Sequence, residues 1–379
     1  MRTLTDVGAR MILARLREAG YTGYLVGGAV RDLLLLRTVE DYDFAPSASS
    51  AELLALFADA RLIGAHYQVT PYRREGVYDD HRHPRDVCAA KTMEEDLARR
   101  DFTINAMAYD GETLLDPFGG GADLEAKQLR CVGDAAVRFG EDALRVLRLA
   151  RFSAVLGFSV EEKTAAAAWA AAPSVGLLPA ARVRTELQKL LLSPHPDALK
   201  VLLDAEGLAA FSLGHTKRDF SLDALPCNML LRWWGVMQLC DAQRLHVVQS
   251  LEFSRRFYAD LLALDAFFCS VSPKNLTELK RQLRSPLPEE TALVLDAFCS
   301  FDASWTVRKA LFAELAARGE AYQRSMLAIT GGSLMALGLR GSEVGRMLDC
   351  LLDAVIEAPA LNEPQILAQM ARALQRLHF

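Results

Sequence analysis

The segment that most constrains this chain is residues 25–43, LVGGAVRDLLLLRTVEDYD. An apolar run, a glycine pair and a helical stretch follow one another, which indicates a strand and a tight turn that lead into a helix. Asp41 and Asp43 come next, and residues two apart on a strand point to the same face. Both carboxylates can therefore reach one place, where they could hold two divalent ions about 3.5–4 Å apart and clamp the oxygens of a phosphoryl transfer.

Two further motifs follow in order, RRDFTINA at 99–106 and EDALR at 141–145. Each motif alone is weak evidence, because glycine pairs and D-x-D sequences are common in ordinary turns. In this order, GGxVRD, D-x-D, RRDxxxNA and EDxxR resemble the class II tRNA nucleotidyltransferases, which are the CCA-adding enzymes and their CC-adding, A-adding and poly(A)-polymerase relatives. The resemblance is almost continuous from Tyr24 to about Phe158 and thins toward the C-terminus.

The pattern of apolar residues changes near Val137. Before it, short apolar runs alternate with turns and helical stretches, and after it helical periodicity continues to the end, broken at prolines. With the resemblance, this predicts an α+β chain with a polymerase-beta-like nucleotidyltransferase head followed by all-α parts. The expected division is a catalytic head (1–136), a helical neck with the nucleotide-selecting helix (137–205), a helical body (206–300) and a tRNA-binding helical tail (301–379).

Composition fits a protein of the cytosol with more than one core. At 379 residues, of which 51% are hydrophobic, the chain is too long for a single core. Its seven cysteines include no C-x-x-C pair, which indicates free thiols in a reducing compartment rather than a disulfide framework or a zinc site. No run approaches 18 apolar residues, and no signal-type segment stands at the N-terminus, so we expect a cytoplasmic protein with no membrane partner.

A formal net charge of −5 is unfavourable for an RNA partner, so binding to phosphates would need local clusters of Lys and Arg. Arg145, Arg148 and Arg151 are three residues apart in succession and would lie along one helix face. Lys280, Arg281 and Arg284 form another group, for which phosphate contact and a solvated helix face are both open.

The resemblance implies roles for the first motif. Asp41 and Asp43 would be the catalytic pair and the Mg²⁺ ligands, since carboxylates are hard oxygen donors suited to a hard ion. Gly27, Gly28 and Arg31 would seat and neutralise the triphosphate.

In RRDFTINA the resemblance assigns Asp101 and Asn105 to contacts with the ribose, and it places Arg99 and Arg100 near phosphates. Residues four apart share a helix face, which would bring Asp101 and Asn105 together. An acid beside the sugar can distinguish ribose from deoxyribose through the 2′-hydroxyl.

EDALR would select the nucleotide, with Asp142 and Arg145 three apart on a helix. Cytosine presents N4–H₂ beside the acceptor N3, and adenine presents N6–H₂ beside the acceptor N1, so one carboxylate and one guanidinium can satisfy either base. Uracil and guanine present O4 or O6 where Asp142 needs a donor, a mismatch that costs roughly 1–3 kcal/mol. Arg148 and Arg151 complete the predicted nucleotide-binding residues.

The sequence departs from the family pattern in four places. Leu36 replaces a usual glycine, and APSAS replaces a segment that commonly holds a threonine. Between Phe57 and Tyr67 the chain has only ADARLIGAH, so a strand of the head is expected to be short or missing. Gln68 stands where relatives have a glutamate that could complete a carboxylate triad, and an amide cannot take a proton from the attacking hydroxyl.

The segment YDDHRHP at 78–84 has two histidines beside two acids and could be mistaken for a metal site. It falls where the family has a loop that helps to change specificity from C to A, and we favour that interpretation.

The resemblance implies a Mg²⁺-dependent enzyme that transfers CMP and AMP from CTP and ATP to the 3′ end of tRNA and releases pyrophosphate, with no protein partner implied. One alternative is a partial enzyme, A-adding rather than CC-adding because YDDHRHP is present. A poly(A) polymerase is less favoured, because the basic and aromatic strand those enzymes carry after D-x-D is absent. Another alternative is a catalytically weakened RNA-binding relative, which Gln68 and the short segment before it would favour.

Overall fold

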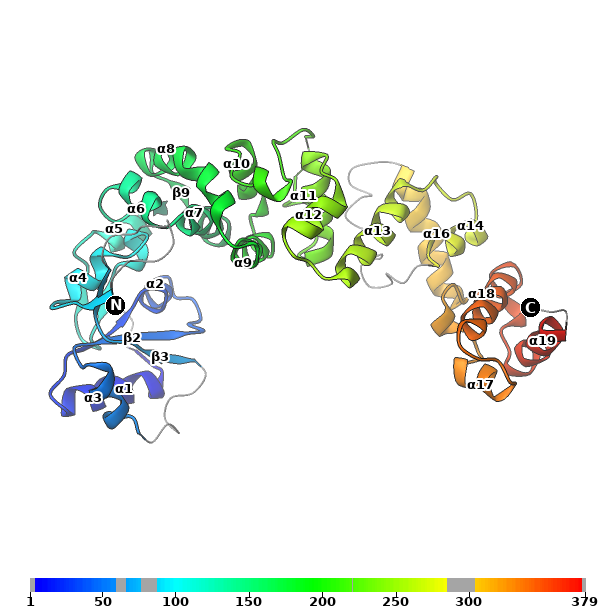
Figure 1. Cartoon of the computed structure of the whole chain (residues 1–379), viewed down its shortest axis with the longest axis horizontal. Coiled ribbons are helices and arrows are strands. Elements are labelled where there is room, and N and C mark those ends of the chain that lie inside the picture. Colours follow the sequence, from blue (N-terminus) through cyan, green and yellow to red (C-terminus); the bar gives the residue numbers. More distant parts are fainter. Residues whose placement is uncertain (1–3, 59–65, 76–86, 220, 285–303, 377–379) are drawn as a thin grey trace. The chain divides into compact units, whose positions relative to one another are not determined.

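The computed structural model describes residues 4–58, 66–75, 87–219, 221–284 and 304–376. Figure 1 shows the helices and strands of the chain in sequence colours. The chain divides into two compact units. Unit 1 consists of Met1–Asp223 and Leu239–Glu252, and unit 2 consists of Ala224–Gln238 and Phe253–Phe379. The four-part division expected from the sequence stays a prediction.

A five-stranded mixed sheet forms the centre of the head, in the order β3-β2-β1-β6-β7. The central strand β1 (Gly23–Val26) is antiparallel to β2 (Tyr42–Pro46) on one side and to β6 (Ala108–Tyr109) on the other. β3 (Tyr67–Val69) runs parallel to β2 at one edge, and β7 (Leu114–Leu115) pairs with β6 at the other. The strand that is expected to be short or missing between Phe57 and Tyr67 falls mostly on residues 59–65, which lie outside the described residues, so it stays a prediction.

The sheet is covered by helices whose apolar residues recur at helical spacing. In α1 (Val7–Glu18) the buried residues are Ala9, Ile12, Leu13 and Leu16, the pattern of one apolar stripe. Asp6 caps this helix by accepting a hydrogen bond from the Ala9 backbone N–H at 2.7 Å.

The helix α3 (Ser50–Leu56) is capped by Ser49. Ser49 and Glu52 form a reciprocal capping box, which requires the acid three residues after the cap.

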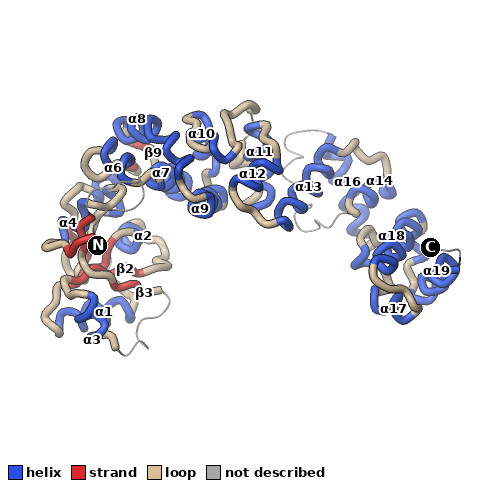
Figure 2. The backbone as a smooth tube through the Cα atoms, in the orientation of Figure 1, coloured by secondary structure: helices blue, strands red, loops and turns tan. Residues whose placement is uncertain are grey.

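The head contains further elements, and Figure 2 labels α2 and α4 among them. They are α2 (Gly28–Leu34), β4 (Arg73–Glu75), β5 (Val87–Ala89), α4 (Met93–Ala98), η2 (Thr103–Asn105), α5 (Gly120–Glu125) and β8 (Gln128–Leu129). β4 and β5 form a separate antiparallel pair. The segment YDDHRHP and residues 59–65 lie outside the described residues.

The rest of unit 1 is helical apart from β9 (Ser159–Val160), which pairs with β8. Its helices are α6 (Ala135–Glu141), α7 (Leu144–Leu156), α8 (Glu162–Ala171), η3 (Ala172–Leu177), α9 (Ala180–Leu191), η4 (Pro196–Ala198), α10 (Leu199–Asp204), η5 (Ala209–Phe211) and α12 (Arg244–Ser250). α7 packs along α9. It ends at Gly157, whose φ of 67° is the left-handed conformation that terminates many helices.

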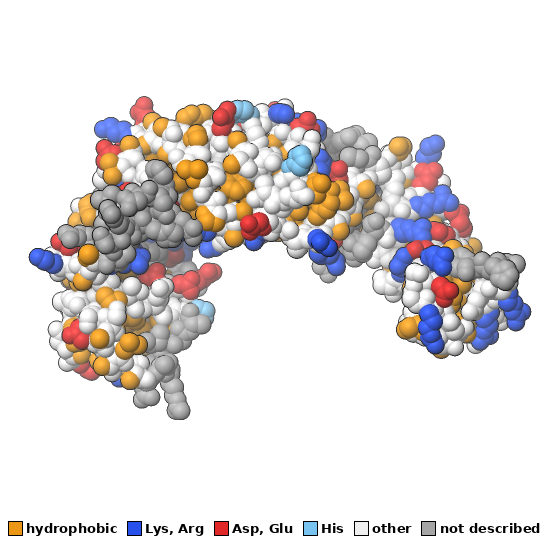
Figure 3. Space-filling model, in the orientation of Figure 1, with side chains coloured by type: hydrophobic (Ala, Val, Ile, Leu, Met, Phe, Trp, Pro, Cys, Tyr) orange, Lys and Arg blue, Asp and Glu red, His pale blue; other side chains and the backbone are white. Residues whose placement is uncertain are grey.

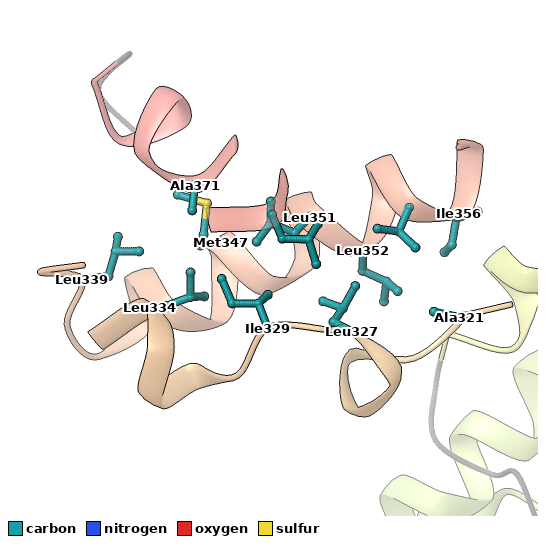
Figure 4. Packing of buried hydrophobic residues seen from close by; sticks show 12 residues of the cluster. Ala321, Leu327, Ile329, Leu334, Leu339, Met347, Leu351, Leu352, Ile356 and Ala371 are labelled. Carbon is teal, nitrogen blue, oxygen red and sulfur yellow. The ribbon is translucent and has the colours of Figure 1, made fainter. Parts of the chain in front are cut away.

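Among the described residues of unit 2, all regular secondary structure is helical. Its helices are most of α11 (Met229–Cys240), then α13 (Arg255–Cys269), α14 (Leu276–Gln282), α16 (Ser304–Arg318), η6 (Arg324–Met326), α17 (Gly331–Ala336), α18 (Ser342–Glu357), η7 (Pro359–Leu361) and α19 (Pro364–Arg376). α18 carries the centre of a core in which Met347, Leu351 and Leu352 are fully buried against Leu334 and Leu367 (Figure 4).

The basic group at 280–284 is neutralised within unit 2. Lys280 pairs with Glu320, Arg281 pairs with Glu357, and the Arg284 Nη1 donates to Asp353 Oδ1 at 2.7 Å. Figure 3 shows basic and acidic side chains mixed over this part of the chain. Neither interpretation left open by the sequence describes the whole group, because Lys280 is buried, not solvated, and all three cations already have carboxylate partners.

None of the described helices combines the length and the apolar character that crossing a bilayer requires.

Candidate active site

Asp41 and Asp43 lie at the start of β2, but only Asp43 is inside the strand. Asp41 immediately precedes it, with a side chain that is 79% exposed. Backbone hydrogen bonding to the segment that leads into β3 begins directly after Asp41, because the Tyr42 N–H donates to the His66 carbonyl at 2.7 Å. The sequence predicts that both acids belong to the strand, but the strand begins at Tyr42 and so includes only Asp43.

The charge of Asp43 depends on its surroundings. Burial raises the pKa of Asp43, Arg100 opposes that rise, and the negative charge of Asp41 adds to it. A divalent cation would offset this repulsion, and protein Mg²⁺ sites often use one or two carboxylates together with substrate phosphates and waters. The pair therefore fits such an ion, although the described residues contain no cluster of three or more side chains that could hold a metal by themselves.

Two residues of the β3 segment face this pair. Gln68 is opposite Asp43 in the parallel β2–β3 ladder, and its side chain is exposed. His66 Nδ1 lies 4.0 Å from Asp41 Oδ1. The sequence singled out Gln68 but missed His66, because only the strand register shows that His66 lies beside Asp41.

The glycine turn is shaped by two requirements at Gly27. Its φ is 68°, which favours glycine, and a Cβ at this position would lie 2.7 Å from Arg100 Nη1. Arg100 is held from the other side by Asp96, with 3.0 Å between Arg100 Nη2 and Asp96 Oδ2. Its buried Nε has no hydrogen-bond partner, and burial lowers the pKa of Arg100. A guanidinium with an unused donor thus lies against the turn.

Two residues of RRDFTINA, Asn105 and Asp101, form a chain of hydrogen bonds between an arginine of α2 and an arginine of α7. Asn105 accepts from Arg31 Nη1 at 2.7 Å and donates to Asp101 Oδ1 at 3.1 Å. Asp101 Oδ2 accepts from Arg148 Nε at 2.7 Å, and the Phe102 N–H donates to Oδ1 at 2.9 Å. Asp101 and Asn105 meet as expected, but through a 3₁₀ turn that begins at Thr103 and not along an α-helix. The ribose contact stays a prediction.

The contacts of Asp101 make its ionised form very stable. Burial alone would raise the pKa of Asp101, but the charge of Arg148 and the bonds from Asn105, Arg148 and the Phe102 N–H lower it from 3.8 to about 2. A depressed carboxylate pKa contributes stability above the unfolded-state value, and this contribution is lost as the pH falls through the folded-state value. The window here runs from about pH 4 down to about pH 2.

We therefore expect Asp101→Asn to lower the free energy of unfolding at pH 7 by roughly 2–3 kcal/mol, because a partly buried Arg148 loses its anion. The deficit should shrink as the pH falls below about 4. Urea unfolding at pH 7 and at pH 3 measures both values. Glu112→Gln, which breaks an exposed pair with Arg17, is the control and should change little at either pH. An equal deficit for Asp101→Asn at both pH values would contradict the account.

EDALR does not form one helix. Asp142 lies between α6 and α7 in an extended conformation, and its Oδ1 accepts from the Leu144 N–H at 3.0 Å. It caps α7, as aspartate often does at the start of a helix. The expectation that Asp142 and Arg145 share a helix is therefore wrong, although they remain close along the chain.

Arg145 is 6% exposed and is held by groups that the sequence did not indicate. Its Nη1 donates to Glu141 Oε2 at 2.5 Å and to the Arg138 carbonyl at 2.8 Å. Its Nη2 donates to the carbonyl of Arg99, 3.2 Å away in RRDFTINA. Glu141 therefore fixes the guanidinium that was predicted to select the base.

Arg148 and Arg151 lie on α7 with Arg145, as the spacing predicts, and each has a carboxylate partner. Arg148 pairs with Asp101, and Arg151 Nε lies 3.2 Å from Glu186 Oε2 on α9. The structure thus joins Arg31, Asn105, Asp101 and Arg148 by direct contacts.

This geometry defines a class. A glycine turn between β1 and α2, a carboxylate pair at the start of the adjacent strand and arginines from a following helix are the parts of a nucleotidyltransferase, an enzyme that handles a nucleoside triphosphate with carboxylates and cations. The family model for the Poly A polymerase head domain matches residues 23–130, and that for the "probable RNA and SrmB-binding site of polymerase A" matches residues 157–218.

Individual relatives narrow the class to a family. The CCA-adding enzyme of Leuconostoc citreum (strain KM20) is 32% identical over 396 aligned residues, which cover 97% of this chain and 96% of that enzyme. That of Geobacillus thermodenitrificans (strain NG80-2) is 42% identical over 216 residues, and this match covers 54% of each chain. The crystal structure of the Bacillus stearothermophilus CCA-adding enzyme in complex with CTP is similar over 99% of both chains, with a TM-score of 0.75 and 26% identity.

The chain therefore belongs to the family of CCA-adding enzymes, which are tRNA nucleotidyltransferases. The predicted family, the enzyme class and the α+β fold with a polymerase-type head and a helical remainder are confirmed.

Proposed function

We propose that this chain adds CMP and AMP, taken from CTP and ATP, to the 3′ end of tRNA and releases pyrophosphate. The observation that carries the proposal is the contact chain from Arg31 through Asn105 and Asp101 to Arg148, beside the Gly27 turn and the Asp41–Asp43 pair, in a member of the CCA-adding family. The relative whose whole chain is similar in structure is described as a complex with CTP.

In the proposed reaction the tRNA 3′-hydroxyl oxygen bonds to the α-phosphorus, and the bond from that phosphorus to the pyrophosphate oxygen breaks. Asp41 and Asp43 would hold Mg²⁺, which when bound neutralises charge on the attacking and leaving oxygens. Arg31 and Arg100, which flank the Gly27 turn, would bind the phosphates. The hydroxyl proton would leave to Asp43 or to water.

Asp142 and Arg145 would select the base by offering an acceptor and donors to cytosine or adenine. Glu141 and two backbone carbonyls hold the Arg145 guanidinium in one orientation. A donor fixed before the nucleotide arrives loses less entropy on binding, and this supports selection by the protein without a nucleic-acid template.

Gln68 provides a direct test of the proton transfer. We expect slow but real transfer by the wild type and faster transfer by Gln68→Glu, because a missing general base typically costs 10²–10⁴-fold. Its register opposite Asp43 places the new carboxylate at the pair. The pH profile of kcat/KM should gain a limb at low pH, where the new carboxylate becomes protonated.

The matched control is Gln128→Glu, a Gln-to-Glu change in β8, a strand outside the five-stranded sheet. It should leave the rate and its pH profile unchanged. A fast wild type that Gln68→Glu slows would show that Gln68 has a structural role.

The partial-enzyme and RNA-binding alternatives are separated by three acceptors: tRNA lacking CCA, tRNA ending in C and tRNA ending in CC, each with labelled CTP or ATP. The proposal expects the first two to accept CMP and the third to accept AMP. Transfer only of AMP to tRNA ending in CC would identify an A-adding enzyme, and binding of tRNA without any transfer would identify a weakened relative.

The identity of the metal ion, the tRNA-binding segment and the cellular location are also proposals. We propose Mg²⁺ as the divalent ion, tRNA binding by the tail at 301–379, and a cytoplasmic location. Free thiols at five of the described cysteines, Cys88, Cys131, Cys227, Cys240 and Cys350, are consistent with a reducing compartment.

A further inference from the structure

One aromatic ring in unit 1 is surrounded by guanidinium groups. Phe152, on α7, has the guanidinium carbons of Arg31, Arg148 and Arg151 at 5.2, 5.4 and 4.4 Å from the centre of its ring. Each distance is within the range of about 6 Å over which a cation is attracted by the face of an aromatic ring. Phe152 itself is 8% exposed.

The three arginines come from two separate segments. Arg148 and Arg151 are on the same helix as Phe152, whereas Arg31 is on α2, which follows the glycine turn. A Cβ added at Gly28 would lie 3.5 Å from Arg31 Nη2, so this guanidinium lies beside the turn. The ring therefore links the turn of the head to the helix that carries the other two arginines.

Three like charges around one ring repel one another and need compensation. Asp32, Asp101 and Glu186 provide it by pairing with Arg31, Arg148 and Arg151 respectively. Burial lowers the pKa of Arg151; Glu186 opposes this, and Arg148 and Arg31 contribute to the lowering, so these cations lie within electrostatic reach of each other.

A second aromatic ring, that of Phe102, also holds the ring of Phe152 in place. Phe102 of RRDFTINA packs edge-to-face against Phe152, with 5.8 Å between the ring centres and 83° between the planes. Phe102 is completely buried. This neighbour is adjacent to Asp101, so the position of the ring is set by the same motif that holds Arg148.

We propose that Phe152 is a positioning residue that holds Arg31, Arg148 and Arg151 as one pre-formed surface for the triphosphate of the incoming nucleotide. The inference rests on the proposed function and adds a residue that touches neither phosphate nor base. A shared ring restricts three flexible side chains before the anion arrives, and this reduces the entropy lost on binding. The aromatic face, and not only apolar bulk, is therefore required at position 152.

The test compares Phe152→Leu with Phe152→Tyr. The leucine variant keeps an apolar side chain but has no aromatic face, and the tyrosine variant keeps that face. Calorimetric titration without tRNA measures the Kd for CTP and for inorganic tripolyphosphate. We expect Phe152→Leu to weaken both by about tenfold and Phe152→Tyr to restore affinity to within about threefold of the wild type.

Phe211→Leu is the matched control, because Phe211 is a buried phenylalanine in η5 of the same unit and has no part in the proposed site. It should lower Tm as Phe152→Leu does but leave both Kd values unchanged. If Phe152→Leu fails to fold, ring-fluorinated phenylalanine at position 152 keeps the shape and weakens the attraction for cations, and it should weaken binding in the same direction.

Unchanged binding of tripolyphosphate by Phe152→Leu, or by the fluorinated protein where the leucine variant does not fold, would overturn the inference. Equal losses in Phe152→Leu and Phe211→Leu would overturn it as well, because they would show a general effect of destabilisation. A wild type that binds tripolyphosphate but transfers no nucleotide to tRNA would contradict the proposed function alone, so the two failures are distinguishable.

Discussion

Asp41→Ala is expected to reduce incorporation of both CMP and AMP below about one hundredth of the wild-type rate while tRNA binding stays within about twofold. The side chain is 79% exposed at the start of β2, so its removal should not unfold the head. Its expected contribution is to the cation that neutralises the reacting oxygens, which no neighbouring side chain replaces. Labelled transfer to tRNA and a separate tRNA-binding assay measure the two effects.

Glu40→Ala is the matched control for this variant. Glu40 is an exposed acid adjacent in the chain, it lies outside β2, and it is not one of the carboxylates proposed to hold the ion. Its removal should leave the rate almost unchanged. Turnover by Asp41→Ala above roughly a hundredth of wild type would exclude Asp41 as a ligand of the catalytic ion.

Arg145→Ala should have the second-largest effect, on the choice of nucleotide. The kcat/KM for CTP and ATP should fall by about 10- to 100-fold, and UTP or GTP should compete better, because discrimination depends on buried donors and acceptors that are paired. Arg145→Lys keeps the charge but loses the fork of donors, so it should show the same loss of discrimination. Competition between labelled nucleotides for one tRNA end measures the ratio directly.

Asp142→Ala should behave in the same way, and the double variant with Arg145→Ala should be less than additive because both groups contact one base. A uniform loss for all four nucleotides would indicate that Arg145 only packs α7 against Glu141 and the RRDFTINA motif.

Local signals in the sequence were sufficient for several parts of the fold and the site. The order of strand, glycine turn, helix and strand at 25–46 is observed as predicted, and the three arginines of α7 lie on one helix. These features depend on the spacing of residues close in the chain, where periodicity and turn chemistry act directly.

Contacts between distant segments could not be predicted in the same way. The pairing of His66 with Asp41 depends on the β2–β3 register, and the sequence before β3 departs from the family pattern. The ion pair of Lys280 depends on Glu320, an acid that follows far along the chain. Asp142 was misplaced for a local reason, since an aspartate can continue a helix or cap it, and here it caps α7.

The ring of Phe152 illustrates both cases. Its place on α7 follows from the apolar periodicity of 144–156, but its contact with Arg31 joins segments more than a hundred residues apart. Such a contact can be seen only in the folded chain, and the sequence alone gives Phe152 no role beyond packing.

The central proposal is that this protein selects C and A by itself, without a nucleic-acid template. The most direct measurement is to incubate one tRNA lacking its CCA end with the protein, Mg²⁺ and all four nucleoside triphosphates together, and then to sequence the 3′ ends that result. The account predicts ends that carry CCA or its shorter intermediates, C and CC. Ends with uridine or guanosine, a long run of adenosines, or tRNA that remains unextended would contradict it.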